Sequence, residues 1–160
     1  MKEAIVGKLR QQFKESVLAV NEFVGDVTIT VKKEDIARVC TFLRDDPEFR
    51  FDSLRDVLGI DHYRPEHRFE VVYNLYSLPN NVRLFLKVQV EENDAVVPSV
   101  SGVWPAADWL ERETFDMYGI KFSGHPDHRR IYMPEDFEYY PLRKEFPLMG
   151  IPDSLPLPRK

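Results

Sequence analysis

The sequence has few cysteines, no long apolar run and no excess of positive charge. A single cysteine, Cys40, excludes an intramolecular disulfide and any zinc or iron–sulfur site built from clustered cysteines. No apolar run approaches the roughly 18 residues of a membrane span, and the start, "MKEAIVGKLRQQFKE", lacks the apolar core of a signal peptide. The formal net charge of −5 argues against nucleic acid as a partner, because phosphate binding needs a basic face. We therefore expect a cytosolic protein in a reducing compartment.

The 160 residues suffice for one globular domain with its own core. Apolar residues at helical spacing alternate with stretches in which every second residue is apolar. These patterns predict, in chain order, a helix over 2–13, strands over 17–23 and 26–31, a helix over 33–45, and strands over 51–63, 68–78 and 82–90. The order helix, two strands, helix, three strands predicts a two-layer α+β fold with the helices packed on one face of the sheet.

A further short helix is expected within "WPAADWLERETFDMYG". Pro105 suits a first helical position, and Gly119 suits the left-handed residue that ends a helix. Apolar side chains go most of the way round this helix, which predicts that it is buried on several faces. These side chains are Trp109, Leu110, Phe115, Met117 and Tyr118.

The chain changes character after Gly124, because seven of its twelve prolines lie between Pro126 and Pro158. Regular helices and central strands are therefore not expected there. Apolar residues are nevertheless spread from Ile131 to Leu157, which is unlike a solvated tail. We predict an α+β domain over 1–124 and an extended Pro-rich C-terminal docking segment over 125–160. The alternative is a tail wrapped on its own sheet.

The charged stretch "ERETFDMYGIKFSGHPDHRRIYMPEDF" allows three interpretations. Zinc could take histidines and a carboxylate from it, but no HExxH pattern is present. Glu113 and Asp116 lie on one helical face, as acid–base chemistry requires. Arg112 is, however, placed to pair with Asp116 at i, i+4, and Arg129 and Arg130 follow, which favours a structural ion-pair lattice. With the apolar tail, this lattice favours a domain built into a larger assembly.

The same stretch resembles the signature of the C subunit of the proton-translocating NADH:quinone oxidoreductases, respiratory complex I. The matching elements are Glu111-Arg112-Glu113, Asp116 followed by two apolar residues, His125, Arg129 and Ile131-Tyr132. "FEVVYNLYSL" and "PLRKEFPL" are also similar to segments of that family, so the resemblance extends from about Val27 to Leu148.

The resemblance implies a non-catalytic scaffold subunit in the peripheral arm, with no cofactor or metal bound by this chain. The complex as a whole oxidises NADH through FMN and iron–sulfur clusters, reduces quinone and translocates protons. The implied partners are the quinone-site subunit, which is the D subunit of such complexes, and the terminal iron–sulfur cluster subunits of B and I type. The implied location is the cytoplasmic side of the bacterial inner membrane, with membrane contact only through the complex.

The docking residues expected on this basis are Glu111, Arg112, Glu113, Asp116, His125, Arg129, Arg130, Ile131, Tyr132, Tyr140, Leu142, Arg143, Lys144 and Phe146. Three alternatives stay open. The first is the equivalent subunit of a membrane-bound hydrogenase or of an F420- or ferredoxin-linked complex. The second is a chaperone-like binder of a quinone-enzyme subunit. The third is a small stand-alone metal-dependent hydrolase that uses His125, His128, Asp127 and Glu113.

Overall fold

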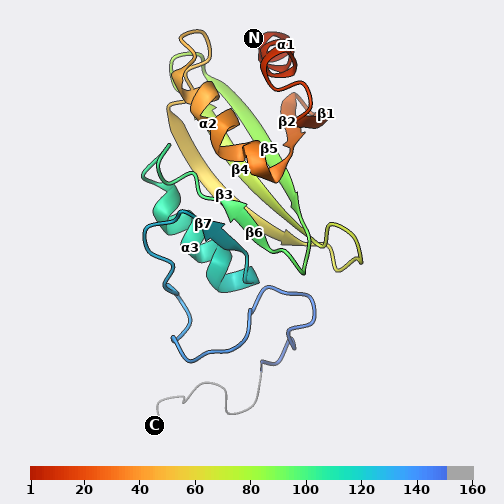
Figure 1. Cartoon of the computed structure of the whole chain (residues 1–160), viewed down its shortest axis with the longest axis vertical. Helices are drawn as coiled ribbons and strands as arrows, with labels where there is room; N and C mark the ends of the chain where they lie inside the picture. Colours follow the sequence, from red (N-terminus) through yellow and green to blue (C-terminus); the bar gives the residue numbers. More distant parts are fainter. Residues whose placement is uncertain (151–160) are drawn as a thin grey trace.

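The computed structural model describes residues 1–150 and is built on a five-stranded sheet with the strand order β1-β2-β5-β4-β3 (Figure 1). The strands of this sheet are β1 (Val17–Phe23), β2 (Asp26–Val31), β3 (Ser53–Asp61), β4 (Phe69–Ser77) and β5 (Val82–Val90). The helices are α1 (Lys2–Gln12), α2 (Ile36–Asp45), which follows a 3-10 turn η1 (Lys33–Asp35), and α3 (Ala107–Tyr118). A separate parallel pair consists of β6 (Val96–Pro98) and β7 (Lys121–Ser123). The expected α+β class and element order are confirmed.

Strand pairing follows from the lengths of the connections. β1 and β2 form one antiparallel hairpin, and β3, β4 and β5 form an antiparallel meander. β2 and β5 pair in parallel at the centre of the sheet, so α2, β3 and β4 make up the long crossover that a parallel pair requires.

The core lies between the sheet and the helices that cover it (Figure 1). Val27, Ile29 and Val31 alternate inward along β2, as expected of a half-buried strand. Cys40 lies on the buried stripe of α2 and is 0% exposed, and this burial raises the pKa of its thiol. The cysteine is therefore a core residue, as the helical spacing predicts.

α3 covers the outer edge of β3, which is an edge strand of the sheet. Thr114 Oγ1 donates a hydrogen bond of 2.9 Å to the carbonyl oxygen of Val57 in β3. The ring of Tyr118 lies so close to Gly59 that a Cβ atom there would come within 2.4 Å of it. α3 thus satisfies a carbonyl group of the strand edge and leaves no space for a side chain at position 59.

Two sequence-based expectations need correction at this level. α3 begins at Ala107 rather than at Pro105, although it does end at Gly119 in the left-handed conformation, with φ of 77°. The β6–β7 pair was not predicted from the sequence. Its strands have three residues each, which is too short for an alternating pattern to appear.

From Gly124 to Gly150 the chain forms turns and bends, without helix or strand. We call residues 124–150 the C-terminal segment. The apolar residues expected further on, Ile151, Leu155 and Leu157, lie outside the described residues. Of the helices between residues 1 and 150, none is long and apolar enough to cross a membrane.

Candidate functional site: a polar helix face that holds the C-terminal segment

The buried side of α3 is mostly polar. Its buried residues are Ala107, Glu111, Arg112, Thr114 and Asp116. The expectation of an apolar helix buried on several faces is wrong for Trp109, which is 63% exposed. The reason is that hydrogen-bond partners for the polar groups come from the strand edge and from later segments of the chain, so polar side chains can be buried here.

Asp116 is the centre of this face and is 0% exposed. Its Oδ2 accepts hydrogen bonds of 3.1, 2.7 and 2.9 Å from the backbone N–H groups of Ile131, Tyr132 and Met133. Its Oδ1 accepts a 2.7 Å charge-assisted bond from Arg130. Burial alone would raise the pKa of Asp116, but these four bonds outweigh it and hold the pKa below its usual value. The carboxylate therefore fixes three consecutive residues of the C-terminal segment.

Arg112 binds the same segment with a positive charge, where Asp116 uses a negative one. Its guanidinium donates to the backbone carbonyl oxygens of Arg129 at 2.9 Å and Arg130 at 3.2 Å, and it lies 3.8 Å from Asp127. The expected i, i+4 pair of Arg112 with Asp116 is therefore not formed. The physical reason is that the Arg112 and Asp116 side chains each bind backbone groups of the segment instead. Helical spacing cannot reveal such partners.

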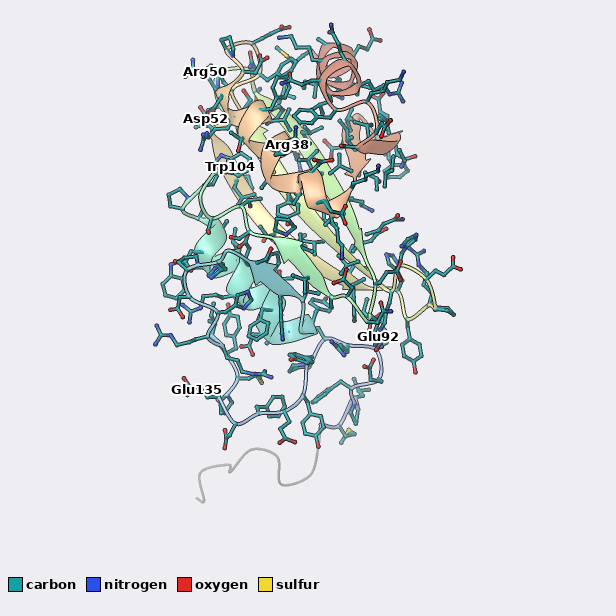
Figure 2. The ribbon with its side chains drawn as sticks, in the orientation of Figure 1. Arg38, Arg50, Asp52, Glu92, Trp104 and Glu135 are labelled. Atoms are coloured by element: carbon teal, nitrogen blue, oxygen red, sulfur yellow. The ribbon has the colours of Figure 1, made fainter. Side chains whose placement is uncertain are left out.

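Asp61, at the end of β3, is a second anchor and was not among the expected site residues. It accepts bonds of 3.1 and 3.0 Å from Arg68 and a bond of 2.8 Å from the backbone N–H of Lys144. Burial opposes ionisation of Asp61, but these bonds outweigh it and lower its pKa. Arg68 also reaches Glu145 in the C-terminal segment and Glu92 beyond β5, where Figure 2 labels it. Only the preference of a buried Arg for acidic partners could have pointed to this anchor.

Arg143 holds the C-terminal segment against the last residue of α3. Its Nε donates a 2.7 Å bond to the carbonyl oxygen of Tyr118, and its guanidinium stacks 4.6 Å from the Tyr140 ring centroid and 5.1 Å from that of Phe69. A Cβ atom at Gly119 would lie 2.7 Å from both Arg143 Nη2 and the Tyr140 ring. Glycine is thus required here by its positive φ and by this close approach.

Glu111 is the third buried acid and belongs to a different environment. It is 0% exposed, with Oε1 accepting 2.7 Å from Val100 N–H and Oε2 lying 2.6 Å from Ser99 Oγ. The His125 side chain is also 0% exposed, with Nε2 3.8 Å from Glu111 Oε2. Burial is the largest influence on Glu111 and raises the pKa of its carboxyl group.

The residues of the metal-hydrolase alternative do not converge. Glu113 is exposed, Asp127 is paired with the arginine two residues on, and His128 Nε2 lies 2.7 Å from a backbone nitrogen. His125 Nε2 is 3.0 Å from a backbone carbonyl oxygen. Over residues 1–150, no group of three or more His, Cys, Asp and Glu side chains is arranged to hold a metal ion. The expected one-face pair of Glu113 and Asp116 is likewise divided, since one is exposed and the other fully buried.

The expected docking residues fall into two sets. Those buried or half-buried against the chain itself are Glu111, Arg112, Asp116, His125, Arg130, Ile131, Tyr140, Arg143 and Phe146. Those exposed are Glu113, Arg129, Tyr132, Leu142 and Lys144. Among the basic docking residues of the C-terminal segment, Arg129, Arg130 and Arg143 form ion pairs within the chain. Within residues 1–150, Lys144 is bound through its backbone N–H and its ammonium group forms no ion pair.

The outer side of the C-terminal segment exposes large apolar side chains. These are Tyr132 (60% exposed), Tyr139 (44%), Leu142 (52%), Leu148 (100%) and Met149 (95%), which together we call the outer apolar face. The ring centroids of Phe137, Tyr139 and Phe146 lie within 6.4 Å of one another. Figure 2 shows Glu135 on the same part of the chain, where it is exposed. The segment therefore has a polar inner side fixed to α3 and an apolar outer side that is exposed within residues 1–150.

This combination of sheet, helix and bound segment belongs to a class of respiratory-complex subunits. Residues 29–152 match the family described as "Respiratory-chain NADH dehydrogenase, 30 Kd subunit", and the chain belongs to that family. It is 49% identical over 149 residues to the NADH-quinone oxidoreductase C subunit of Geotalea uraniireducens (strain Rf4), covering 93% of this chain and 89% of that protein. It is 50% identical over 144 residues to the corresponding protein of Roseiflexus sp. (strain RS-1), covering 90% and 83%. The resemblance carried by the 111–132 signature is confirmed.

Solved structures agree with the fold. A trypsin-resistant fragment of Nqo5 superposes with a TM-score of 0.68 at 32% identity, covering 78% of this chain and 97% of that one. A chain of the membrane-bound sulfane sulfur reductase, an archaeal respiratory membrane complex, superposes with a TM-score of 0.73. That chain is 23% identical and covers 92% of this chain and 86% of its own length, so it supports the fold alone.

Proposed function

We propose that this chain is a non-catalytic scaffold subunit in the peripheral arm of an NADH:quinone oxidoreductase, docked through its C-terminal segment onto the quinone-site subunit. The observation that carries the proposal is the two-sided segment: its inner side is fixed by Asp116, Arg112 and Asp61, and its outer apolar face has no cover within residues 1–150. Large apolar side chains exposed along one short stretch of chain favour a protein interface.

The signature residues have a different role in this proposal from the one expected from sequence. Asp116 and Arg130 shape the segment from within, and they do not touch the partner. The contact itself is made by exposed residues such as Leu142 and Leu148. Preorganising the segment lowers the entropy lost on docking, which favours affinity without adding contacts. The division into a 1–124 domain and a 125–160 docking segment is kept as part of the proposal.

The redox groups are assigned to other subunits. NADH, FMN, the iron–sulfur clusters and quinone belong to the complex as a whole, and terminal cluster subunits of B and I type are further neighbours of this chain. The chain's one cysteine is a buried core residue, which leaves no thiolate for a cluster. We place the protein on the cytoplasmic side of the bacterial inner membrane, attached through its partners.

The proposal is tested by exchanging outer apolar residues for charge in the natural host. A tag at the N-terminus is distant from the segment, because Figure 1 places α1 at the opposite end of the molecule from it. The double variant Leu142→Asp/Leu148→Asp and a control, Phe23→Asp, are each purified from detergent-solubilised membranes. Phe23 is 80% exposed at the end of β1 and offers the same kind of substitution far from the segment.

The double variant is expected to lose the quinone-site subunit and NADH:quinone reductase activity, while Phe23→Asp retains both. Circular dichroism of the purified chains verifies that both variants fold. A double variant that assembles normally would show that the outer apolar face is not the docking surface. Surface exchange is preferable to cutting the chain at Gly124, since that cut would also remove all four hydrogen-bond donors of Asp116.

A second candidate keeps the scaffold role and changes the host. The fold shared with a chain of an archaeal sulfane sulfur reductase complex favours an equivalent subunit of a related membrane-bound complex with a different donor, such as a hydrogenase or an F420- or ferredoxin-linked enzyme. The same purification decides between them. Quinone reduction by NADH supports the first candidate, and reduction only with hydrogen, F420 or ferredoxin supports the second.

A further inference from the structure

Glu111 is buried without a cation beside it among residues 1–150. Its carboxyl group is 0% exposed and, in that part of the chain, meets two hydrogen-bonding groups, Ser99 Oγ and the backbone N–H of Val100. Both groups are neutral. An ionised carboxylate in a dry interior needs a positive partner or several N–H donors, and it otherwise takes up a proton.

His125 does not provide the missing charge. Its Nδ1 accepts a hydrogen bond of 3.0 Å from the backbone N–H of Asp127, so Nδ1 carries no proton. The imidazole therefore carries its proton on Nε2, which lies 3.0 Å from the carbonyl oxygen of Asp108, where that proton can be donated. This tautomer is neutral, and its Nε2 is 3.8 Å from Glu111 Oε2, beyond hydrogen-bonding distance.

The remaining titratable groups around Glu111 carry no positive charge. Asp108 shares α3 with it and disfavours its ionisation, while Cys40 from α2 and Tyr73 from β4 are buried neutral groups whose ionisation Glu111 disfavours. The Tyr73 hydroxyl is buried and has no hydrogen-bond partner in the described chain. Burial is the largest influence on Glu111 and raises the pKa of its carboxyl group, outweighing the opposing effect of the bonds to Ser99 and Val100.

A chain of hydroxyl groups leads from Glu111 to the surface. Ser99 Oγ lies 2.6 Å from Glu111 Oε2 and 2.8 Å from Ser101 Oγ. Ser101 lines an open surface hollow of about 410 Å³, together with Asp108 and Gly124. Serine hydroxyls donate and accept by rotation, so this chain can carry a proton in either direction.

We propose that Glu111 is a buried proton-binding site, protonated at neutral pH, that exchanges its proton with solvent through Ser99 and Ser101. The protonated carboxyl donates through Oε2 to Ser99 and accepts through Oε1 from Val100, which satisfies every polar atom of the group. On deprotonation the proton passes to Ser99, Ser99 passes its own to Ser101, and Ser101 releases one to water in the hollow.

The protonation state is tested by carbon-13 NMR of the full chain labelled at the glutamate carboxyl carbon. We expect one resonance to stay at the position of a protonated carboxyl at neutral pH, and to be absent in Glu111→Gln but present in Glu113→Gln. Glu113 lies on the same helix but is exposed, so it is the matched control. If every glutamate resonance titrates as an exposed carboxylate does, the proposal is overturned, and this result needs no variant to fold.

The route is tested by infrared spectroscopy after transfer into D₂O. The C=O band of the protonated carboxyl shifts when its proton is replaced by deuterium, and its rate of shift reports exchange. Ser99→Ala removes the hydroxyl adjacent to Glu111, and we expect exchange at least tenfold slower while the carboxyl stays protonated. An unchanged rate in Ser99→Ala would overturn the route through Ser99 and Ser101.

Discussion

Asp116 and Glu111 are two carboxyl groups on one helix, both fully buried, and they are held in opposite ways. Asp116 receives three backbone N–H groups and the guanidinium of Arg130, so it is bound as an anion. Glu111 meets one backbone N–H and one hydroxyl, and the nearby His125 accepts a backbone N–H at Nδ1. Equal burial thus has opposite consequences, and the donors that meet each group decide between them.

The two carboxyl groups also differ in role, since Asp116 holds a segment of the chain in place and Glu111 exchanges a proton. Asp116 connects α3 to residues that follow it by 15 to 17 positions, so its charge organises the C-terminal segment. Glu111 connects α3 to Ser99 and Val100 before it and joins no part of that segment other than His125. The first is an anchor for a surface, and the second is a site for a proton.

Asp116→Asn is expected to have the largest effect. The amide leaves Arg130 buried without its counter-charge and turns an N–H group toward N–H donors, so the loss should be about 3–5 kcal/mol of unfolding free energy. Urea unfolding measures it. Glu113→Gln, three residues earlier and exposed, should stay within about 0.5 kcal/mol of the native chain. If both variants lost the same free energy of unfolding, Asp116 would not be the anchor of the C-terminal segment.

Gly119→Ala is expected to act on the same segment with a smaller effect. A left-handed conformation costs a residue with a Cβ atom about 1–2 kcal/mol, and the new methyl group meets Arg143 and Tyr140 at 2.7 Å. The variant should lose slightly more than about 2 kcal/mol and should be cleaved faster by protease within residues 124–150. Gly7→Ala is the control, because a Cβ at Gly7 meets nothing within 4 Å. Cleavage of Gly119→Ala at the same slow rate as the native chain would contradict the close approach of Gly119 to Arg143 and Tyr140.

The free energy of unfolding should fall as the pH is lowered into the acid range, and it should also fall as the pH rises toward neutral. Asp116 and Asp61 have lowered pKa values in the folded chain, so their contribution is present above the unfolded value of 3.8 and is lost as pH falls below it. Glu111 has a raised pKa, so the folded chain binds the extra proton and loses stability as pH rises above 4.5. Each slope approaches about 1.4 kcal/mol per pH unit for one group. Urea unfolding over a pH series measures both slopes.

Glu111→Gln is expected to have the smallest effect below pH 4.5, where Glu111 is protonated in both the folded and the unfolded chain. Its amide can donate to Ser99 and accept from Val100 as the protonated acid does, so stability there should change by less than about 1 kcal/mol. The variant should lack the decline above pH 4.5 that Glu111 contributes, so at neutral pH it should be at least as stable as the native chain. A large loss at neutral pH, similar to that of Asp116→Asn, would indicate that Glu111 is ionised.

The main sheet and the first two helices could be predicted because their signals are local. β2 shows period-2 alternation and α2 shows an apolar stripe, and both patterns reflect burial of the residues themselves. The β6–β7 pair joins Val96–Pro98 to Lys121–Ser123. No local pattern encodes that pairing, because each strand is only three residues long.

The site could be predicted as a set of residues but not as a geometry. The charged stretch identified Arg112, Asp116 and Arg130 as related, and two of them do form an ion pair. Sequence assigned the wrong partner to Arg112, because the atoms that it binds are backbone carbonyl oxygens, which every residue has. The apolar tail residues similarly indicated burial without showing which side chains would stay exposed.

Hydrogen exchange at the backbone amides of Ile131, Tyr132 and Met133 tests the central claim most directly. These three amides are bound by Asp116 Oδ2 and by no strand or helix, so their protection depends on that carboxylate. The account predicts that they are protected in the native chain and in Glu111→Gln, and exposed to rapid exchange in Asp116→Asn. Equal protection in Asp116→Asn, or rapid exchange in the native chain, would contradict it.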